Sequence, residues 1–437
     1  MRKKTKIFSS LLCSTVLMMG ILTGCSDSGK DTSNNAAKEQ KTLTLLIDNQ
    51  TTLDGIKAVA DAFEKKYDIK IEFETRPGGA EGDNVVKTRL ATGDMTDLVY
   101  YNSGALVQAL NPEQNFVDLT NEPFMKNVMD SFKKTVTSNG KVYGIPAGPV
   151  IVGGWLYNKK VYKELGLSIP KTWSELMKNN EKIKAAGKTP VIGTYKDDWT
   201  TQLIVLADNY NVLAKTPTFA EDYTANKAKF SDTPEALRSF KKLEEVYKKG
   251  YLNKDFLATN YDAGLKMLAE GKGVHYPMLT FALTAIAKNY PDKINDIGVF
   301  PQPSDSPDIN GFTVWMPAAI YINKNSDHVE EAKKFVEFYI SPEGMNAYLS
   351  KVKPEGPLAI KGAKLPDDVY PAVKEMLPYF ESGKTAPALE FLSPVKGPSL
   401  PQITTEVGSG IKSAKEGAKL YDRDVEKQAK QLGLPGW

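Results

Sequence analysis

The residues that could act as catalysts are few and are scattered along the sequence. Two histidines occur, His275 and His328, and neither has metal-ligand spacing to another histidine or to a cysteine. No Gly-x-Ser-x-Gly turn, phosphate-binding loop or cysteine nucleophile is present. We therefore expect no catalytic residues, no bound metal and no cofactor.

Residues suited to holding a polar ligand follow three apolar segments near the N-terminus. Leu43–Ile47, Ile69–Phe73 and Asp97–Tyr101 are typical of strands, and apolar residues recur at helical spacing between the first two. This order predicts a parallel α/β sheet, in which ligands collect beyond the carboxyl ends of the strands. The residues expected at that edge are Asp48, Asn49, Arg76, Tyr101 and Asn102.

Two consecutive tyrosines, Tyr100 and Tyr101, end the third of these strands. Tandem tyrosines are ferric-ion ligands in some binding proteins, but successive side chains on a strand point to opposite faces. Two tyrosines on one strand do not converge on one ion, and no histidine is near them in the sequence. We expect Tyr100 to be buried and Tyr101 to face the ligand.

Trp199 lies in the polar segment Lys196–Thr200, where a large aromatic side chain has little reason to be unless it stacks on something. A sugar ring offers an apolar C–H face for the indole and hydroxyl groups for Asp198 and Asn102. The segment therefore favours a carbohydrate contact.

The elements that position these residues are organised around Gly140–Trp173. Pro146, Gly148 and Pro149 break the chain and predict a hinge. The apolar run Val150–Tyr157 then has the length of a strand that is buried on both faces, so we expect Trp155 to belong to the core.

Three motifs in this stretch carry a family resemblance. They are Gly-Lys-x-Tyr-Gly-x-Pro at 140–146, Tyr-Asn-Lys at 157–159 and Pro-x-Thr-Trp-x-Glu-Leu at 170–176. Their order resembles the carbohydrate-binding group of extracellular solute-binding proteins of ABC importers, the group that includes the maltose-binding protein. The resemblance extends over nearly all of residues 41–437.

This resemblance implies an α/β fold of the type II periplasmic-binding-protein class. Each of its two lobes would be a mainly parallel sheet flanked by helices, with three hinge crossings near Pro146–Val150, Pro301–Pro307 and Val352–Pro357. The boundaries that follow are 42–148 and 303–352 for the first lobe, and 149–302 and 353–437 for the second.

The resemblance also implies a ligand and a partner. Asp198 and Trp199 match an acidic-aromatic cluster that stacks on sugar rings in the family. Where relatives have a ligand-side tryptophan after a later strand, this sequence has Tyr276, which becomes the candidate, and Trp315 is a further one. The expected function is capture of a sugar, an oligosaccharide, and its delivery to an ABC permease by a monomeric protein.

The first 24 residues have the composition of an export signal. Four basic residues precede the mainly apolar stretch Ile7–Met19, which is too short to span a bilayer comfortably. Leu22-Thr23-Gly24-Cys25 resembles the bacterial lipobox, so we expect Cys25 to carry the lipid, such as palmitate, that anchors the protein to the outer face of a bacterial, Gram-positive cell membrane. Residues 25–41 are polar and predict a flexible tether.

Charge and cysteine content exclude other classes. Removing the four basic residues of segment 1–24 from a formal net charge of +3 leaves −1, which gives no support for nucleic-acid binding. Only Cys13 and Cys25 are cysteines, so the exported protein has no disulfide to form.

Two other functions remain open from the sequence. One is binding of a non-sugar solute such as a peptide, a polyamine or a metal. The other is a polysaccharide-active enzyme, because glycoside hydrolysis needs only two carboxylates about 5 to 9 Å apart. The acidic residues considered for that role are Glu74, Asp97, Asp198 and Glu390.

Overall fold

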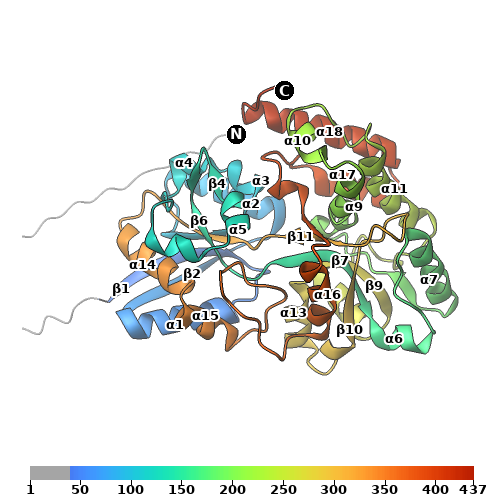
Figure 1. Cartoon of the computed structure of the whole chain (residues 1–437), viewed down its shortest axis with the longest axis horizontal. Coiled ribbons are helices and arrows are strands. Elements are labelled where there is room, and N and C mark those ends of the chain that lie inside the picture. Colours follow the sequence, from blue (N-terminus) through green and yellow to red (C-terminus); the bar gives the residue numbers. More distant parts are fainter. Residues whose placement is uncertain (1–39) are drawn as a thin grey trace, which may run out of the picture. The chain divides into compact units, whose positions relative to one another are not determined.

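Two β-sheets form the framework of the chain (Figure 1). The computed structural model describes residues 40–437; the predicted signal segment 1–24, Cys25 and the predicted tether up to residue 39 lie outside the described residues. Lys41, which the sequence places in the tether, is the first residue of β1. Among the helices of residues 40–437, none is both long enough and apolar enough to cross a bilayer.

The first sheet has the strand order β2-β1-β3-β12-β6. Its strands are β1 (Lys41–Asp48), β2 (Ile69–Arg76), β3 (Leu98–Tyr101), β6 (Gly144–Pro146) and β12 (Ala319–Ile322). β1 is parallel to β2 and β3, with Leu45 opposite Phe73 and Leu98, so the predicted parallel start is confirmed. β12 is antiparallel to both of its neighbours, β3 and β6.

The helices of the first lobe, which we define by this sheet, cover its faces (Figure 1). They are α1 (Asp54–Tyr67), α2 (Gly79–Thr92), α3 (Ala105–Gln108), α4 (Pro112–Asn115), α5 (Asp130–Thr135), α14 (Val329–Tyr339) and α15 (Pro342–Leu349). A small ribbon of β4 (Thr137–Ser138) and β5 (Lys141–Val142) and a 3₁₀ turn, Pro123–Asn127, complete the lobe. α1, α14 and α15 pack together, with the Phe63 and Phe335 ring centroids 5.1 Å apart.

The second sheet is built on β7 (Ile151–Asn158), which contains most of the predicted apolar strand. Its other strands are β8 (Thr189–Val191), β9 (Gly273–Leu279), β10 (Ile297–Pro301), β11 (Phe312–Trp315) and β13 (Thr385–Pro387). β7 is antiparallel to β9, β10 and β11, whereas β8–β9 and β11–β13 are parallel pairs. This sheet is therefore mixed and not mainly parallel as the sequence predicts.

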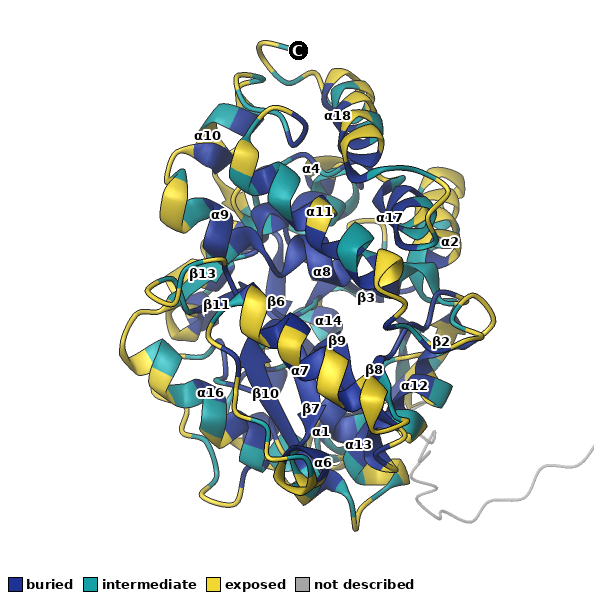
Figure 2. Cartoon of the chain, turned by 90° about the vertical axis from the view of Figure 1, so that its right-hand side faces the viewer, coloured by how far each residue is buried: buried dark blue, intermediate teal, exposed yellow. Residues whose placement is uncertain are grey.

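Apart from α8 (Leu203–Leu206), which is wholly buried, the helices of the second lobe, which we define by this second sheet, carry exposed as well as buried residues. They are α6 (Lys159–Glu164), α7 (Trp173–Ala185), α8 (Leu203–Leu206), α9 (Asn209–Lys215), α10 (Phe219–Thr224), α11 (Pro234–Lys248), α12 (Tyr261–Ala269), α13 (Ala282–Asn289), α16 (Pro371–Glu381), α17 (Leu400–Gly408) and α18 (Ala414–Gln431). Three 3₁₀ turns, Asp198–Gln202, Ile294–Asp296 and Leu389–Phe391, lie between them. Figure 2 shows exposed residues along α7 and buried residues throughout β7 and β9.

The first two crossings between the lobes are short. Residues 147–150 connect β6 to β7, where the sequence places the first crossing. Residues 316–318 connect β11 to β12 and form the second, so the predicted crossing at Pro301–Pro307 is wrong. The apolar run Phe312–Ile322, assigned to the first lobe together with 303–311, is divided between the two sheets.

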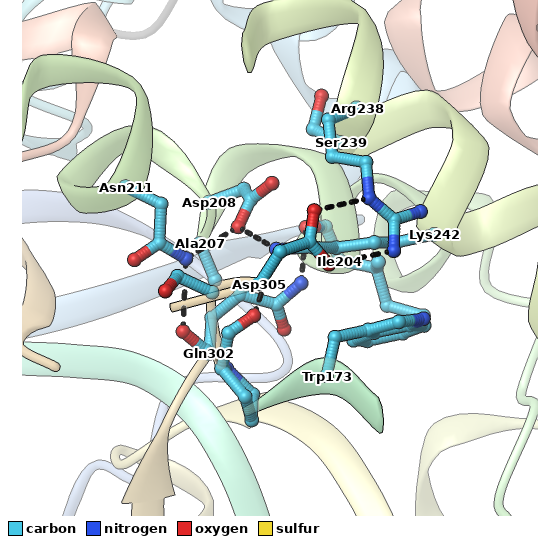
Figure 3. A network of polar contacts seen from close by, with 12 residues as sticks. Trp173, Ile204, Ala207, Asp208, Asn211, Arg238, Ser239, Lys242, Gln302 and Asp305 are labelled. Carbon is cyan, nitrogen blue, oxygen red and sulfur yellow. Dashed lines mark hydrogen bonds and ion pairs between the residues drawn. The ribbon is translucent and has the colours of Figure 1, made fainter. Parts of the chain in front are cut away.

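A polar network explains why the segment after β10 stays in the second lobe (Figure 3). The ammonium group of Lys242, which is 1% exposed, lies 2.6 Å from a carboxylate oxygen of Asp208 and donates to the carbonyl of Pro303 at 2.8 Å. One helical turn earlier, Arg238 donates to both carboxylate oxygens of Asp305 at 2.8 and 2.9 Å. These bonds hold residues 303–305 against α11. The Lys242–Asp208 pair is buried, so removing one of its partners would cost about 3 to 5 kcal/mol, whereas the Arg238–Asp305 pair is partly exposed and contributes less.

The third crossing is a long connection. It starts after α15, near Val352, as predicted, but it does not end at Pro357. Main-chain hydrogen bonds join residues 359–361 to residues 127–129 of the first lobe. After touching the second lobe at Glu355, the chain thus returns to the first lobe and becomes part of the second lobe at α16, which packs against β10.

Candidate functional site

A cavity of about 430 Å³ is lined by residues of both lobes. It brings together the predicted ligand residues Asp48, Arg76, Asn102, Asp198, Trp199 and Trp315. Three predicted residues, Asn49, Tyr101 and Tyr276, are not among its lining. The strand-end rule thus identifies the edge of the first sheet at which the cavity lies. It does not identify which side chains at that edge line the cavity.

The first-lobe wall carries a buried guanidinium. Arg76 is 5% exposed; its Nη1 donates to the carbonyl of Pro77 at 3.0 Å and its guanidinium lies 5.4 Å from the centroid of the Tyr101 ring. Its Nε–H is buried and has no hydrogen-bond partner among the described residues. Such an unsatisfied donor costs stability, so it marks a place where a ligand acceptor would be favourable.

The neighbouring carboxylate of Asp48 is already used by the backbone. One of its oxygens accepts from the N–H groups of Gln50 at 3.0 Å and Thr51 at 2.9 Å, and the other accepts from the Thr51 hydroxyl at 2.6 Å. This turn keeps the carboxylate at the end of β1. Asn49, next in the chain, is exposed and bonds through its backbone to β2, which places its side chain outside the cavity.

The two tyrosines of β3 lie the opposite way to the prediction. Tyr100 lines the cavity, whereas Tyr101 is 1% exposed and donates its hydroxyl hydrogen bond to Asp83 of α2 at 2.9 Å. Side chains alternate along the strand as expected, but the face of Tyr101 is covered by α2, and burial raises its pKa. Tyr100, and not Tyr101 as expected, is therefore the tyrosine that faces the cavity.

An aromatic cluster forms the second-lobe wall. The ring centroid of Trp199 lies 5.5 Å from that of Tyr261 and 5.9 Å from that of Phe281, and Tyr261 and Phe281 are 6.0 Å apart. All three line the cavity. The indole N–H of Trp199 and the hydroxyl of Tyr261 are buried without hydrogen-bond partners among the described residues. The cluster offers an apolar surface together with two polar groups that lack partners.

Asp198 flanks this cluster. Its Oδ2 accepts a hydrogen bond from the Gln402 side chain at 3.0 Å, and burial raises the pKa of its carboxyl. A partly desolvated carboxyl beside an aromatic surface suits a ligand that has both hydroxyl groups and C–H faces.

Trp315 and Glu390 form another part of the second-lobe wall. The Trp315 indole N–H donates to Glu390 Oε1 at 2.7 Å, and Lys396 lies 2.7 Å from Glu390 Oε2. All three residues line the cavity. Since Glu390 is paired on both oxygens, it holds the indole in place and has little free capacity to bind a ligand or to move a proton.

Tyr276 does not replace a ligand-side tryptophan. It is 1% exposed, and its hydroxyl lies 2.8 Å from the Thr194 hydroxyl, close to Gly264 of α12. Its side chain points from β9 toward α12, and burial raises its pKa. Next to it, His275 is fully buried between Tyr162 at 2.6 Å and Asn180 at 2.8 Å, and burial lowers its pKa to about 3, so this histidine is structural.

Several cavity residues were missed by the sequence analysis. Phe281 follows β9 by two positions, and the strand-end rule applied to that strand would have found it. Tyr261 is the first residue of α12, after the N-cap Asn260, and nothing in the local pattern indicates a cavity. Glu355 and Tyr348 come from the third crossing and from α15, where no pattern indicates a ligand.

Two of the four carboxylates considered for hydrolysis lie outside the cavity lining. Glu74 pairs with Arg89 at 2.7 Å, and Asp97 accepts hydrogen bonds from Thr44 and Ser326. Neither lines the cavity, which leaves Asp198 and Glu390. Within residues 40–437, no three histidine, cysteine or acidic side chains are grouped closely enough to hold a metal ion.

Two α/β lobes joined by three crossings around a cavity define a solute-binding protein of the two-lobed type II class, as predicted. The chain belongs to the family of bacterial extracellular solute-binding proteins, whose pattern residues 49–346 match. Members of this family are binding proteins that act outside the cytoplasm.

Similar proteins include two named for sugars. The multiple sugar-binding protein of Streptococcus mutans serotype c is 26% identical over 340 residues, which cover 75% of this chain and 77% of that protein. The melibiose/raffinose/stachyose-binding protein MelE of Bacillus subtilis is 22% identical over 342 residues, 75% of each chain. The solved structure of the solute-binding protein RafE in complex with raffinose has a TM-score of 0.72 at 24% identity, covering 90% of this chain and 99% of that one, and shows that the fold is shared.

Proposed function

We propose that this protein captures an oligosaccharide in the cavity between its lobes and delivers it to the membrane permease of an ABC importer. The observation that carries the proposal is the Trp199–Tyr261–Phe281 cluster, with its two unpaired polar groups, facing Asn102 and Arg76 of the other lobe across one cavity. The sugar-binding relatives support the same ligand class.

The cavity wall suits a ligand that has both apolar faces and hydroxyl groups, as a sugar does. A pyranose ring buries its C–H face against an aromatic side chain while its hydroxyl groups bond to side chains around it. Ligand groups that satisfy Trp199 Nε1–H or Arg76 Nε–H remove a desolvation cost of about 1 to 3 kcal/mol for each donor. Contact with both lobes also favours the arrangement in which they are closed.

A glycan panel tests this proposal. Raffinose, stachyose, melibiose and a chitin oligosaccharide are each added to the protein, and the melting temperature is measured. Binding to the native state should raise it, by an amount that grows with the logarithm of the sugar concentration. A panel of peptides, polyamines and metal ions is the comparison. A rise in melting temperature with one of these, and none with any sugar, would show that the ligand is not a sugar.

The enzyme alternative has its own test. The protein is incubated with the sugar that gives the largest shift, and the sugar is recovered and analysed. We expect it unchanged, because Glu390 is occupied by Trp315 and Lys396, and the other two carboxylates considered for hydrolysis, Glu74 and Asp97, do not line the cavity. Shortened products that vanish in the Asp198→Asn protein would establish hydrolysis instead.

We also propose, from the sequence alone, that Cys25 anchors the protein to the membrane of a Gram-positive bacterium. Cys25→Ser should release the protein from the membrane fraction and leave its fold and affinity unchanged, because residues 26–39 precede the first strand. Acyl chains bind bilayers by about 0.8 kcal/mol per buried CH₂, so the lipid dominates attachment. Fractionation after a salt wash measures this; a variant that stays with the membrane would rule out the lipid anchor.

A further inference from the structure

Glu355 is a buried carboxyl at the cavity that the proposed sugar contacts leave unused. It lies in the third crossing, is 8% exposed and lines the cavity together with Tyr100, Tyr348 and Thr284. The hydroxyl of Thr284 in α13 donates to Glu355 Oε1. The carboxyl therefore lies where both lobes and the third crossing meet.

No cation balances this carboxyl among the described residues. The ion pairs of residues 40–437 do not include Glu355, and the titratable groups that act on it, or on which it acts, are tyrosines. They are Tyr100 of β3, Tyr348 of α15, Tyr261 of α12 and Tyr370, the residue before α16. Asp48 and Arg76 add one negative and one positive charge near Tyr100.

Burial without a neighbouring cation disfavours the ionised form of Glu355. Desolvation raises the pKa of Glu355 to about 7, although hydrogen bonds from Thr284 and the backbone oppose the change. In the unliganded protein this carboxyl thus holds a proton under mildly acidic conditions. Glu390, the other buried glutamate of the cavity, differs because Lys396 is its partner.

We propose that the Glu355 carboxylate, buried in the cavity wall beside Thr284 and Tyr348, accepts a hydrogen bond from a hydroxyl group of the ligand, so that ligand binding is linked to ionisation of this residue. The inference rests on the proposed sugar-binding function and adds a residue and a proton linkage to it. A hydroxyl donor stabilises the ionised carboxylate in the same way that a water molecule or a cation would.

Bonding of the ligand to the ionised form of Glu355 fixes the direction in which affinity changes with pH. A ligand that bonds to the ionised form binds more tightly when the proton has already left. Affinity should therefore rise with pH and level off above the pKa of the free carboxyl, giving about tenfold tighter binding at pH 8 than at pH 6.

The test is calorimetric titration of the unmodified protein with raffinose at pH 6, 7 and 8, in buffers of different ionisation enthalpy. We expect proton release on binding and the tenfold gain, and Glu355→Gln should bind with an affinity that does not change over this range. Glu390→Gln is the matched control: it retains Glu355, so its affinity should still rise about tenfold from pH 6 to pH 8. Binding that is independent of pH, or proton uptake, would overturn the inference and leave the sugar-binding proposal intact. If raffinose does not bind, the titration uses the panel sugar with the largest melting shift, and absence of binding by every sugar of the panel would count against both.

A ligand-free measurement checks the protonation state separately. A carboxyl whose pKa is raised on folding stabilises the folded state at pH values below its pKa in the unfolded protein. This contribution is lost as the pH rises through its pKa in the folded protein. Relative to Glu355→Gln, the unmodified protein should therefore lose stability in urea between pH 5 and pH 8. A difference between the two proteins that stays constant over this range would show that Glu355 carries no releasable proton and would overturn the inference.

Discussion

Replacing Trp155 by alanine is expected to lower the free energy of unfolding by about 3 to 5 kcal/mol, the range for loss of a large buried aromatic side chain. The side chain is 0% exposed, and its ring centroid lies 6.0 Å from Trp173, 5.9 Å from His275 and 6.4 Å from Phe300. Its indole N–H also donates to the Gln302 side chain, which would be left without that partner. Urea unfolding at equilibrium measures the change.

Trp437→Ala is the matched control for this substitution. Trp437 is an indole near the C-terminus that is only partly buried, donates to the Thr224 carbonyl at 2.8 Å and packs under the Lys229 ammonium at 4.3 Å. Its loss should cost clearly less than that of Trp155, because less apolar surface is buried around it. Equal losses for the two variants would show that Trp155 is not a core residue of the second lobe.

Trp199→Ala is expected to weaken sugar binding more than tenfold, which is over about 1.4 kcal/mol. The substitution removes an aromatic face from the cavity wall and the unpaired indole N–H. Because the side chain is half-buried against Tyr261 and Phe281, stability should fall far less than in Trp155→Ala. Calorimetry with the best sugar of the panel gives the affinity.

Two controls make this result specific. Trp437→Ala removes an indole outside the cavity and should bind the sugar as the unmodified protein does. Trp199→Phe retains an aromatic face and should recover part of the affinity. If Trp199→Ala bound the sugar normally while Trp155→Ala lost binding without losing stability, the core and cavity assignments would be exchanged.

Local patterns predict the strands and helices of this chain well, because burial leaves a period in the sequence. The β-α-β start and the buried strand with Trp155 are both present. Sheet membership is harder to predict. Phe312–Ile322 is one apolar run in the sequence, yet residues 316–318 carry the chain from one sheet to the other. Only the pairing partners, β7 for β11 and β3 for β12, decide where the run divides.

The cavity is predicted to the level of strand ends but not of single side chains. Alternation along β3 requires Tyr100 and Tyr101 to face opposite ways, and it does not say which face α2 will cover. Trp199 is identifiable because an indole in a polar segment is unusual. Phe281 follows the end of β9 and is within reach of the strand-end rule. Tyr261 and the carboxyl of Glu355 lie in segments whose local pattern indicates no ligand, and only tertiary packing brings them to the cavity.

Solution scattering with and without sugar tests most directly whether the two lobes capture a ligand between them. The three crossings at 147–150, 316–318 and after Val352 are the covalent connections that a rotation would have to deform, and the cavity takes its lining from both lobes. A sugar that contacts both walls should shift the population toward the closed form, so the radius of gyration should fall on saturation. The Trp199→Ala protein should compact less at equal sugar concentration. An unchanged radius of gyration under saturating, calorimetrically confirmed sugar would contradict capture by closure of the lobes.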